Sequence, residues 1–495
     1  MTAHSSRRGK LLDTRALRVS LREILRHPLK LVMLGVVFKW LCQVASLKLG
    51  ILGLGKGPFP MPMLGTIWRI IVAGISNLHR LAVADFQKYG RIHGWAYFHK
   101  AQCATICPHH LRRILVTHWK KYDRSDIEQA AFRDLLGRGL ILVGNEQWGE
   151  VRRVFQSGFS DGNIVAFREV LQVWSADFAQ GLLASSTASP VDVQEVAQRL
   201  TFRVIGLFTL GVDFEEPQCI ARLTDGMAGS AWCCHNYGDL WFQLLSHTQD
   251  RVLFGPFQWW RLLKTPHVKA FERGQQLLLA EIDAAFAARM SGSQSVLKSG
   301  LASSFKDLAS LIVESQKSRN FSQDDLRHQA LTFLFAGHDT TTNLIAWCLL
   351  LLADHPDVQN RARQEVRNAH ECKSVKPFLR CCLLETLRLY PSVPLRSRTL
   401  TEQDSFAPVE PMACPALRIH DQVHLQKGMG VAFAINALHR DPGLWCEPDK
   451  FQPERFWEHS MATDGTLPCA PRMGDESRPL AYLPFGAGPR RCIGK

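Results

Sequence analysis

The sequence predicts a mainly α-helical protein with small β-sheets, and three observations lead to this fold class. Apolar residues recur at spacings of three and four, the period of a helix buried on one face. The stretches with this period are residues 126–136, 164–183, 191–208, 268–290, 325–353 and 356–390. Short runs typical of β-strands occur near 92–106 and 395–435. Apolar residues make up 46% and charged residues 21% of the 495 positions, which is ordinary for a chain with a sizeable core.

The N-terminal segment, residues 1–56, differs in composition from the rest of the chain. Its first 30 residues carry eight Lys or Arg against two acidic residues, and residues 31–54 are mostly apolar but interrupted by Lys39, Gln43 and Lys48. A spanning helix needs about 20 apolar residues. A tilted span, an interfacial helix and a targeting peptide therefore all stay open. The Pro-rich stretch 57–62 is expected to connect this segment to one large domain, residues 57–495.

The charge and the cysteine spacing argue against a nucleic-acid-binding protein and against a zinc site. The net charge is +14, with no dense basic run beyond the start of the chain, which favours an acidic membrane surface or an acidic protein partner over nucleic acid. The 14 cysteines form no C-x-x-C pair and lack zinc-site spacing, so we expect most of them to be buried and reduced. A polar linker is predicted at 291–305.

The last 12 residues, PFGAGPRRCIGK (484–495), form a Gly-rich loop around one cysteine, Cys492. Gly486 and Gly488 permit the positive φ angles of a tight bulge, which can direct N–H groups at a thiolate. Arg490 and Arg491 add positive charge beside it. A lone cysteine in such a loop is more often structural than a ligand, so the rest of the chain has to decide between the two.

Three further motifs carry polar residues at helical spacing. The apolar stretch LTFLFAGHDTTTN (331–343) is interrupted by Gly337, Asp339 and Thr340. An intramembrane helix there is disfavoured because His338 and Asp339 would lie within the bilayer. The other two motifs are Glu385–x–x–Arg388, followed by Pro-Glu-Arg455-Phe at 453–456, and Trp148–x–x–x–Arg152. Each alone is also compatible with an ordinary surface helix.

In order and spacing, these motifs resemble those of the cytochromes P450. The resemblance implies the cytochrome P450 fold and a haem b whose iron is bound by the Cys492 thiolate, a ligand that promotes O–O cleavage. It implies that Arg490 pairs with a haem propionate and that Phe485 shields the sulfur. Trp148, Arg152 and, less specifically, Arg398 would also contact the propionates.

The resemblance also assigns roles to the two internal helices. Gly337 would loosen the central helix beside bound oxygen, and Asp339 and Thr340 would form an acid–alcohol pair that delivers protons, a general-acid task. His338 would face protein. Glu385, Arg388 and Arg455 would lock together in a structural network around the haem.

The function implied is that of a monooxygenase. It would use dioxygen and two NADPH-derived electrons, delivered by a reductase, to hydroxylate an apolar substrate. The stretches 336–341 and 436–442 (NALHRDP) look closest to the fatty-acid-hydroxylating branches, although Ala336 lacks the carboxylate that some of them esterify to haem. The aromatic stretch 254–260 fits either a membrane-dipping loop or a buried corner. The loop 457–484 looks longer than usual for the family.

Two rival functions remain: a haem-thiolate isomerase or dehydratase, and a non-enzymatic or inactive haem-binding paralogue. The intact Asp339–Thr340 pair argues against the isomerase or dehydratase. An inactive paralogue would not need the pair either, but the end of the sequence just after Cys492 keeps that alternative open. The catalytic domain is expected to face the cytosol from the endoplasmic reticulum, through a shallow anchor or a targeting segment. The family's proximal helix is expected after Cys492, so the chain also reads as C-terminally truncated, with weak haem binding in the form given.

Overall fold

The computed structural model describes residues 35, 37, 57, 58, 60, 65–98, 100–186, 190–254, 265–292, 305–316, 321–368, 377–408, 422–457 and 480–495. The predicted N-terminal segment therefore lies outside the described residues except for positions 35 and 37. The aromatic stretch from 255 onward, most of the 291–305 linker and residues 458–479 also lie outside them.

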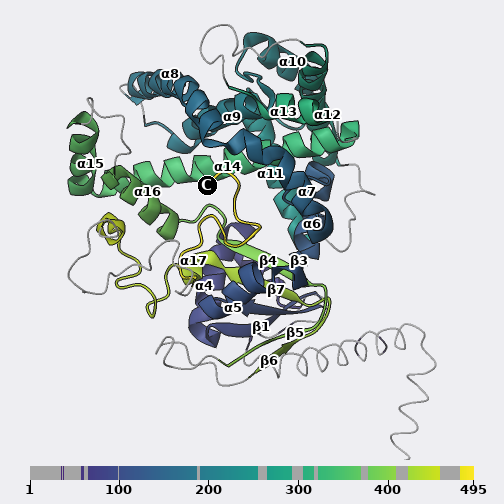
Figure 1. Ribbon diagram of the computed structural model, residues 1–495, viewed down its shortest axis with the longest axis vertical. Coiled ribbons are helices and arrows are strands. Elements are labelled where there is room, and N and C mark those ends of the chain that lie inside the picture. Colours follow the sequence, from purple (N-terminus) through teal and green to yellow (C-terminus); the bar gives the residue numbers. More distant parts are fainter. Residues whose placement is uncertain are drawn as a thin grey trace, which may run out of the picture.

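Helices dominate the described chain, as predicted (Figure 1). The larger helical part contains α6 (Asp126–Leu136), α7 (Asn145–Gln156), α8 (Asp161–Ser186), α9 (Val193–Leu210), α10 (Pro217–Met227), α11 (Tyr237–Phe254), α12 (Pro266–Met290), α13 (Leu308–Gln316) and α14 (Gln323–Asp354). The prediction of one helical stretch over 356–390 needs correction, because two helices lie there, α15 (Pro356–Asn368) and α16 (Pro377–Leu389). Proline is well suited to the first position of a helix and interrupts a helix interior, so Pro377 starts a new helix.

The long helix α14 crosses the middle of the molecule and packs along α9 (Figure 1). Its start is fixed by a capping box, in which the Ser322 side chain accepts from the Asp325 N–H and the Asp325 carboxylate accepts from the Ser322 N–H. The partner helix begins at Asp192, whose side chain accepts from the N–H groups of Gln194 and Glu195. These caps fix where the two helices begin, and a core of aliphatic and aromatic side chains packs around them.

A five-stranded sheet lies below the helical part in Figure 1 and carries one wall of the site. Its strands, in spatial order, are β1 (Ile92–Tyr97), β2 (Lys100–Thr105), β7 (Gly430–Ala434), β4 (Leu395–Leu400) and β3 (Tyr122–Arg124). Only β2 and β7 pair in parallel. A small second sheet pairs β5 (Asp404–Phe406) with β6 (Val423–Leu425). The strands confirm the two predicted β regions; β3 was missed because three residues are too few to show alternation.

Four short or medium helices accompany the sheet: α3 (Trp68–Ala73), α4 (Leu78–Tyr89), α5 (Pro108–Arg112) and α17 (Ile435–Leu438). Among the described residues, no helix has the length and apolar character needed to cross a membrane. The described cysteines are free, and Cys233, Cys446 and Cys492 are the exposed ones among them, which confirms that most are buried and reduced.

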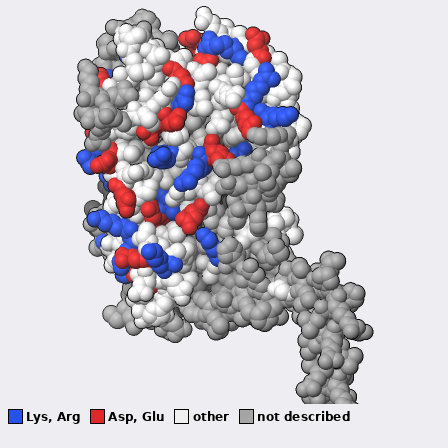
Figure 2. Space-filling model, turned by 90° about the vertical axis from the view of Figure 1, so that its right-hand side faces the viewer, with Lys and Arg blue, Asp and Glu red and all other residues white. Residues whose placement is uncertain are grey.

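The surface charges alternate in sign over the face shown in Figure 2. Basic and acidic side chains lie beside one another there, in keeping with ion pairs such as Arg199–Glu215 and Arg327–Asp283. The positive charge of the chain is therefore not gathered into a single patch on this face.

Candidate active site

The Gly-rich loop that carries Cys492 folds back on itself through its own backbone. The Cys492 N–H donates to the Phe485 carbonyl at 2.9 Å, and the Arg491 N–H donates to the Gly488 carbonyl at 3.1 Å. Gly486 and Gly488 both have a φ of 68°. A Cβ on Gly488 would lie 1.9 Å from the Leu115 carbonyl oxygen, so only glycine fits there. The predicted tight bulge is present, and it presents Cys492 near its tip.

Cys492 is exposed as a residue, yet the protein around its thiol opposes ionisation. Desolvation raises the pKa of this thiol, while the Gly494 N–H and the charges of Arg152 and Arg396 lower it, and desolvation dominates. The thiol is therefore neutral at pH 7 in the protein alone. A metal cation bound to the sulfur would remove the proton, since a coordinating thiol is deprotonated outright.

Helix α7 is fastened to the cysteine loop by the two residues that the sequence singled out. Trp148 is buried, and the guanidinium groups of Arg152 and Arg490 lie over its ring, 5.5 Å and 5.2 Å from the centroid. Arg152 also donates from Nη1 to the Arg491 carbonyl at 2.8 Å. The W-x-x-x-R helix and the cysteine loop thus form one rigid unit.

A cluster of arginines lies next to this unit, and we call Arg124, Arg396, Arg398 and Arg490 the arginine cradle. Arg398 on β4 and Arg124 on β3 are direct partners in the strand register, and both are 6% exposed. Arg490 donates to the Val143 carbonyl at 3.0 Å and lies 3.6 Å from the Asp123 carboxylate. Arg124 was not predicted, because no local motif marks it and only the pairing of β3 with β4 brings it to Arg398.

Several N–H groups of the cradle have no acceptor among the described residues. They are Arg124 Nε, Arg398 Nη1, and Arg490 Nε and Nη2. Burial, reinforced by the neighbouring guanidinium groups, lowers the pKa of Arg398 to about 9 and that of Arg490 to about 10, and it lowers that of Arg124 strongly. Buried, unpaired cations are costly unless an anion joins them. The cradle therefore fits a group that carries carboxylates, as the haem propionates do.

The central helix places its unusual residues on two different sides. His338 is 2% exposed; its Nδ1 lies 2.9 Å from the Thr201 hydroxyl on α9, and burial lowers its pKa to about 3, so it faces protein as expected. Thr340 donates from Oγ1 to the Ala336 carbonyl at 2.7 Å. Burial raises the pKa of Asp339, with a smaller opposing effect from Asn343. A carboxyl group with a raised pKa holds its proton closer to neutral pH, which suits a proton donor.

Gly337 allows the close approach of the two central helices. A Cβ built on Gly337 would lie 2.4 Å from Cδ1 of Ile205, which belongs to α9. The resemblance gave this glycine a role beside bound oxygen, and the structure adds a packing reason for it. The contact lies in the same turn of α14 as Asp339 and Thr340. It therefore also fixes how closely that turn approaches α9.

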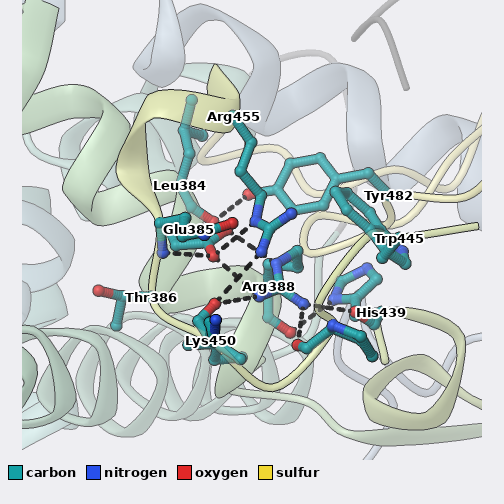
Figure 3. A network of polar contacts seen from close by, with 12 residues as sticks. Leu384, Glu385, Thr386, Arg388, His439, Trp445, Lys450, Arg455 and Tyr482 are labelled. Carbon is teal, nitrogen blue, oxygen red and sulfur yellow. Dashed lines mark hydrogen bonds and ion pairs between the residues drawn. The ribbon is translucent and has the colours of Figure 1, made fainter. Parts of the chain in front are cut away.

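Glu385, Arg388 and Arg455 come together in a buried network (Figure 3). Arg388 donates to both Glu385 carboxylate oxygens at 2.8 Å, and Arg455 Nε donates to Oε1 at 3.0 Å. The remaining guanidinium hydrogens of both arginines bond to backbone carbonyls of the segment 439–450. Such full satisfaction is what a buried ion network requires.

His439 joins this network to the cysteine loop, a connection that the sequence analysis missed. Its Nδ1 lies 3.2 Å from the Arg388 carbonyl, and its Nε2 accepts from the Leu483 N–H at 2.9 Å (Figure 3). Burial lowers the pKa of His439 to about 3, so the ring stays neutral and can accept that bond. Tyr482 adds a second link by donating to the Leu384 carbonyl at 2.7 Å. The motif HRDP contained the signal, since a histidine amid a buried segment needs two partners.

The comparisons with known proteins agree with this geometry. The model of the family described as Cytochrome P450 matches residues 56–495. The chain is 27% identical over 410 residues to Cytochrome P450 4F3 of Homo sapiens, covering 78% of this chain and 71% of the relative. It is 25% identical over 452 residues to Probable cytochrome P450 4aa1 of Drosophila melanogaster, covering 88% and 79%. Over 195 residues it is 34% identical to Leukotriene-B4 omega-hydroxylase 3 of Mus musculus, covering 37% and 32%.

Enzymes of this family hold haem through a cysteine thiolate and use dioxygen, with electrons that a reductase passes on from NADPH, to oxidise lipophilic substrates. The helical fold, the cysteine loop and the arginine cradle, with its four N–H groups that lack a hydrogen-bond acceptor in the described part of the chain, all accommodate that cofactor. With the family match extending over residues 56–495, the chain belongs to the cytochrome P450 family of haem-thiolate monooxygenases.

Proposed function

We propose that this monooxygenase hydroxylates a long-chain fatty acid or a related lipid, with Cys492 as the axial ligand of its haem. The observation that carries the site assignment is the arginine cradle, whose buried N–H groups lack acceptors beside the cysteine loop. The lipid substrate is supported by the similarity to Leukotriene-B4 omega-hydroxylase 3 and by the NALHRDP stretch.

In this proposal the haem propionates complete the arginine cradle. Arg124, Arg398 and Arg490 donate to them, while Arg152 and Trp148 hold the cysteine loop against α7 and line the same edge. Phe485 contributes the carbonyl that fixes Cys492 and a half-buried ring next to it. When bound, the haem supplies the redox chemistry that activates dioxygen, with the thiolate donating electron density.

The proton-handling residues are Asp339 and Thr340. The Thr340 hydroxyl donates within its own helix to the Ala336 carbonyl, and it can rotate to donate toward the haem side. The Ser392 hydroxyl donates to the Thr340 carbonyl at 2.8 Å and so holds the backbone of this turn while the side chain turns. Asp339, whose pKa burial raises, then returns a proton to Thr340.

We also propose that residues 1–56 attach the catalytic domain, residues 57–495, to the cytosolic face of an endoplasmic reticulum membrane. The basic and apolar composition of that segment supports this. Ile71 and Val72 on α3, which follows the segment, are 45% and 79% exposed. Apolar side chains at that position suit contact with the same membrane surface.

The test is turnover of a lipid panel. Purified full-length protein, reductase and NADPH are incubated with fatty acids, sterols and terpenes, and oxygen uptake and products are followed by mass spectrometry. We expect a hydroxylated fatty acid formed with NADPH and dioxygen consumption. Product without oxygen uptake would indicate an isomerase or dehydratase, and haem loading without turnover of any substrate would indicate an inactive paralogue.

Cys492→Ser tests the assignment of the haem ligand, and Cys446→Ser is its matched control. An alcohol cannot supply thiolate donation, so the absorption band of the reduced carbon-monoxide complex near the family's characteristic wavelength should vanish. Cys446→Ser, at another exposed cysteine, should leave the band unchanged. A persistent band in Cys492→Ser would remove Cys492 from the site.

A further inference from the structure

Glu128 on α6 is a half-buried carboxylate placed against the arginine cradle. Its Oε1 accepts from the Ser397 N–H at 3.1 Å and from the Ser397 hydroxyl at 3.3 Å. Its Oε2 lies 3.8 Å from Arg396 Nη2. The carboxylate thus joins α6 to strand β4 at the residue between Arg396 and Arg398.

The charges of this region do not balance within the described residues. Four guanidinium groups form the cradle, and the two carboxylates that act on them are Asp123 and Glu128. Burial, and to a smaller extent the neighbouring arginines, lowers the pKa of Arg124 and of Arg398, whereas Glu128 raises both, so Glu128 already stabilises the charged cradle. Two positive charges remain, which matches the two propionates of a haem.

The ion pair between Glu128 and Arg396 is loose. Its 3.8 Å separation compares with 2.6 Å for Arg327–Asp283 and 2.7 Å for Arg203–Asp213. About a quarter of the Arg396 side chain is exposed, so its guanidinium has room to turn. A stronger or closer anion would therefore draw Arg396 away from Glu128 at little cost.

We propose that Glu128 is a positioning residue that serves as the resident counter-ion of the cradle and competes with the haem propionates for Arg396. It keeps the four arginines compatible with folding before haem binds and weakens the hold on haem afterwards. This inference rests on the proposed assignment of the cradle to the propionates. It concerns a residue that neither the motifs nor the central helix singles out.

The proposal predicts that removing the charge of Glu128 slows haem loss, whereas a residue that only fastened α6 to β4 would have the opposite effect. Glu128→Gln keeps the shape and one oxygen acceptor for Ser397 but removes the negative charge. Arg396 is then free for the propionates, and the repulsion between Glu128 and the propionates is gone. Haem loss should slow by roughly three- to tenfold, the order expected for one unit charge acting through a half-buried site. If Glu128 only fastened α6 to β4, the substitution would speed haem loss instead.

The experiment measures haem transfer from the loaded full-length protein to excess apomyoglobin, followed by absorbance at low and high salt. Asp126→Asn is the matched control, because Asp126 is an exposed carboxylate on the same helix with its ion-pair partner, Lys100, at 3.5 Å. We expect slower loss in Glu128→Gln, an effect that shrinks with salt, and no change in Asp126→Asn. The haem reduction potential should also rise, since a negative charge has been removed near the iron. Equal or faster haem loss in Glu128→Gln overturns the proposal.

Two further variants separate the possible failures. In an Arg396→Gln background the Glu128→Gln effect should shrink to the part that comes from direct repulsion between Glu128 and the propionates, because the competition needs Arg396; an undiminished effect contradicts the proposal. Arg398→Leu tests the cradle itself and should speed haem loss. If it does while Glu128→Gln fails to slow the loss, only the Glu128 inference falls. If neither Arg398→Leu nor Arg490→Leu changes haem loss, the propionate assignment is wrong, and the inference falls with it.

Discussion

Near the cysteine loop, the buried side chains of Arg124, Arg398 and Arg490 have N–H groups without a hydrogen-bond acceptor among the residues that the structure describes. A buried N–H group without an acceptor costs about 1–3 kcal/mol, and more when it is charged. In the protein without its cofactor, the buried cradle therefore lowers the free energy of unfolding. A bound dicarboxylate offsets that cost, so cofactor binding and folding are expected to be coupled in this chain.

At the same scale, Thr340 and Asp339 can be tested by substitution. Thr340→Ala should retain haem but lower the ratio of product to NADPH severalfold and release peroxide, because proton delivery loses its hydroxyl. Asp339→Asn should lower turnover. The two ratios are measured by NADPH absorbance, peroxide assay and product analysis. Thr341→Ala, at the adjacent exposed position, is the control and should resemble the unaltered protein. Normal coupling and turnover in both variants would contradict the acid–alcohol pair.

At the scale of elements, the contact between α9 and α14 positions the turn that carries Asp339 and Thr340, the residues proposed to deliver protons. Thr201 and Ile205 lie one turn apart on α9, where they meet His338 and Gly337 of α14. Both contacts lie on the side of α14 that faces α9, and the two residues that follow are Asp339 and Thr340. The distance between α9 and α14 at this contact therefore sets where the Asp339 carboxyl and the Thr340 hydroxyl lie.

Gly337→Ala tests that contact. The added Cβ would meet Ile205 Cδ1 at 2.4 Å, so overpacking should cost about 1–3 kcal/mol, partly offset by the roughly 1 kcal/mol that alanine gains in a helix. Urea unfolding followed by circular dichroism measures the net loss. Ile205→Val removes the clashing methyl group and should restore much of the stability in the double variant. Simple additivity of the two substitutions would show that the contact does not govern the effect.

A second link between elements joins α16 to the cysteine loop through His439 and Tyr482. Arg388 anchors one end of this link and the Leu483 N–H the other. The Glu385 network thereby fixes the backbone at Leu483, three residues before Gly486, the first glycine of the loop. The network that the family resemblance assigned to structure thus also holds the ligand loop in place.

At the scale of the whole molecule, three buried neutral histidines link stability to pH. Burial lowers the pKa of His110 to about 4 and those of His338 and His439 to about 3, below the value of 6.5 for an exposed histidine. Below pH 6.5 the unfolded chain binds protons at these positions and the folded chain does not. Stability should therefore fall as the pH falls from 6.5 toward 4, by up to about 1.4 kcal/mol per pH unit for each histidine.

Urea unfolding between pH 7.5 and 4.5 measures this slope. His110→Gln should make it shallower by about one proton, because burial lowers the pKa of His110 to about 4. A slope in His110→Gln equal to that of the unaltered protein would show that His110 does not titrate on unfolding.

Removing residues 1–56 tests the proposed domain division. The shortened chain should be more soluble, with an unchanged haem spectrum, because the proposed catalytic domain begins after the Pro-rich connector. Sedimentation with vesicles of acidic lipid should also decrease. Loss of the haem spectrum would show that the segment belongs to the catalytic fold, and protease protection of residues 57–495 in sealed microsomes would contradict the cytosolic placement.

The sequence by itself determined the fold class, the approximate bounds of α6, α8, α9, α12 and α14, and the residues of the local motifs, whereas α10, α11 and α13 were not predicted. Amphipathic periodicity depends only on residues within one helix, so α6, α9 and α14 could be predicted. The positive φ angles of Gly486 and Gly488 likewise depend on a single short loop. The roles of Cys492, Asp339 and Thr340 could be proposed because each motif spans a few consecutive residues.

Only the tertiary structure decided which distant residues join those motifs. Arg124 meets Arg398 through the pairing of β3 with β4, Glu128 reaches the same strand from α6, and His439 bonds to Leu483. These contacts are made by strand pairing and helix packing between segments far apart in the chain, and no local period or spacing encodes them. The division of α15 from α16 is the reverse case, in which a local signal at Pro377 was present but outweighed by continuous periodicity.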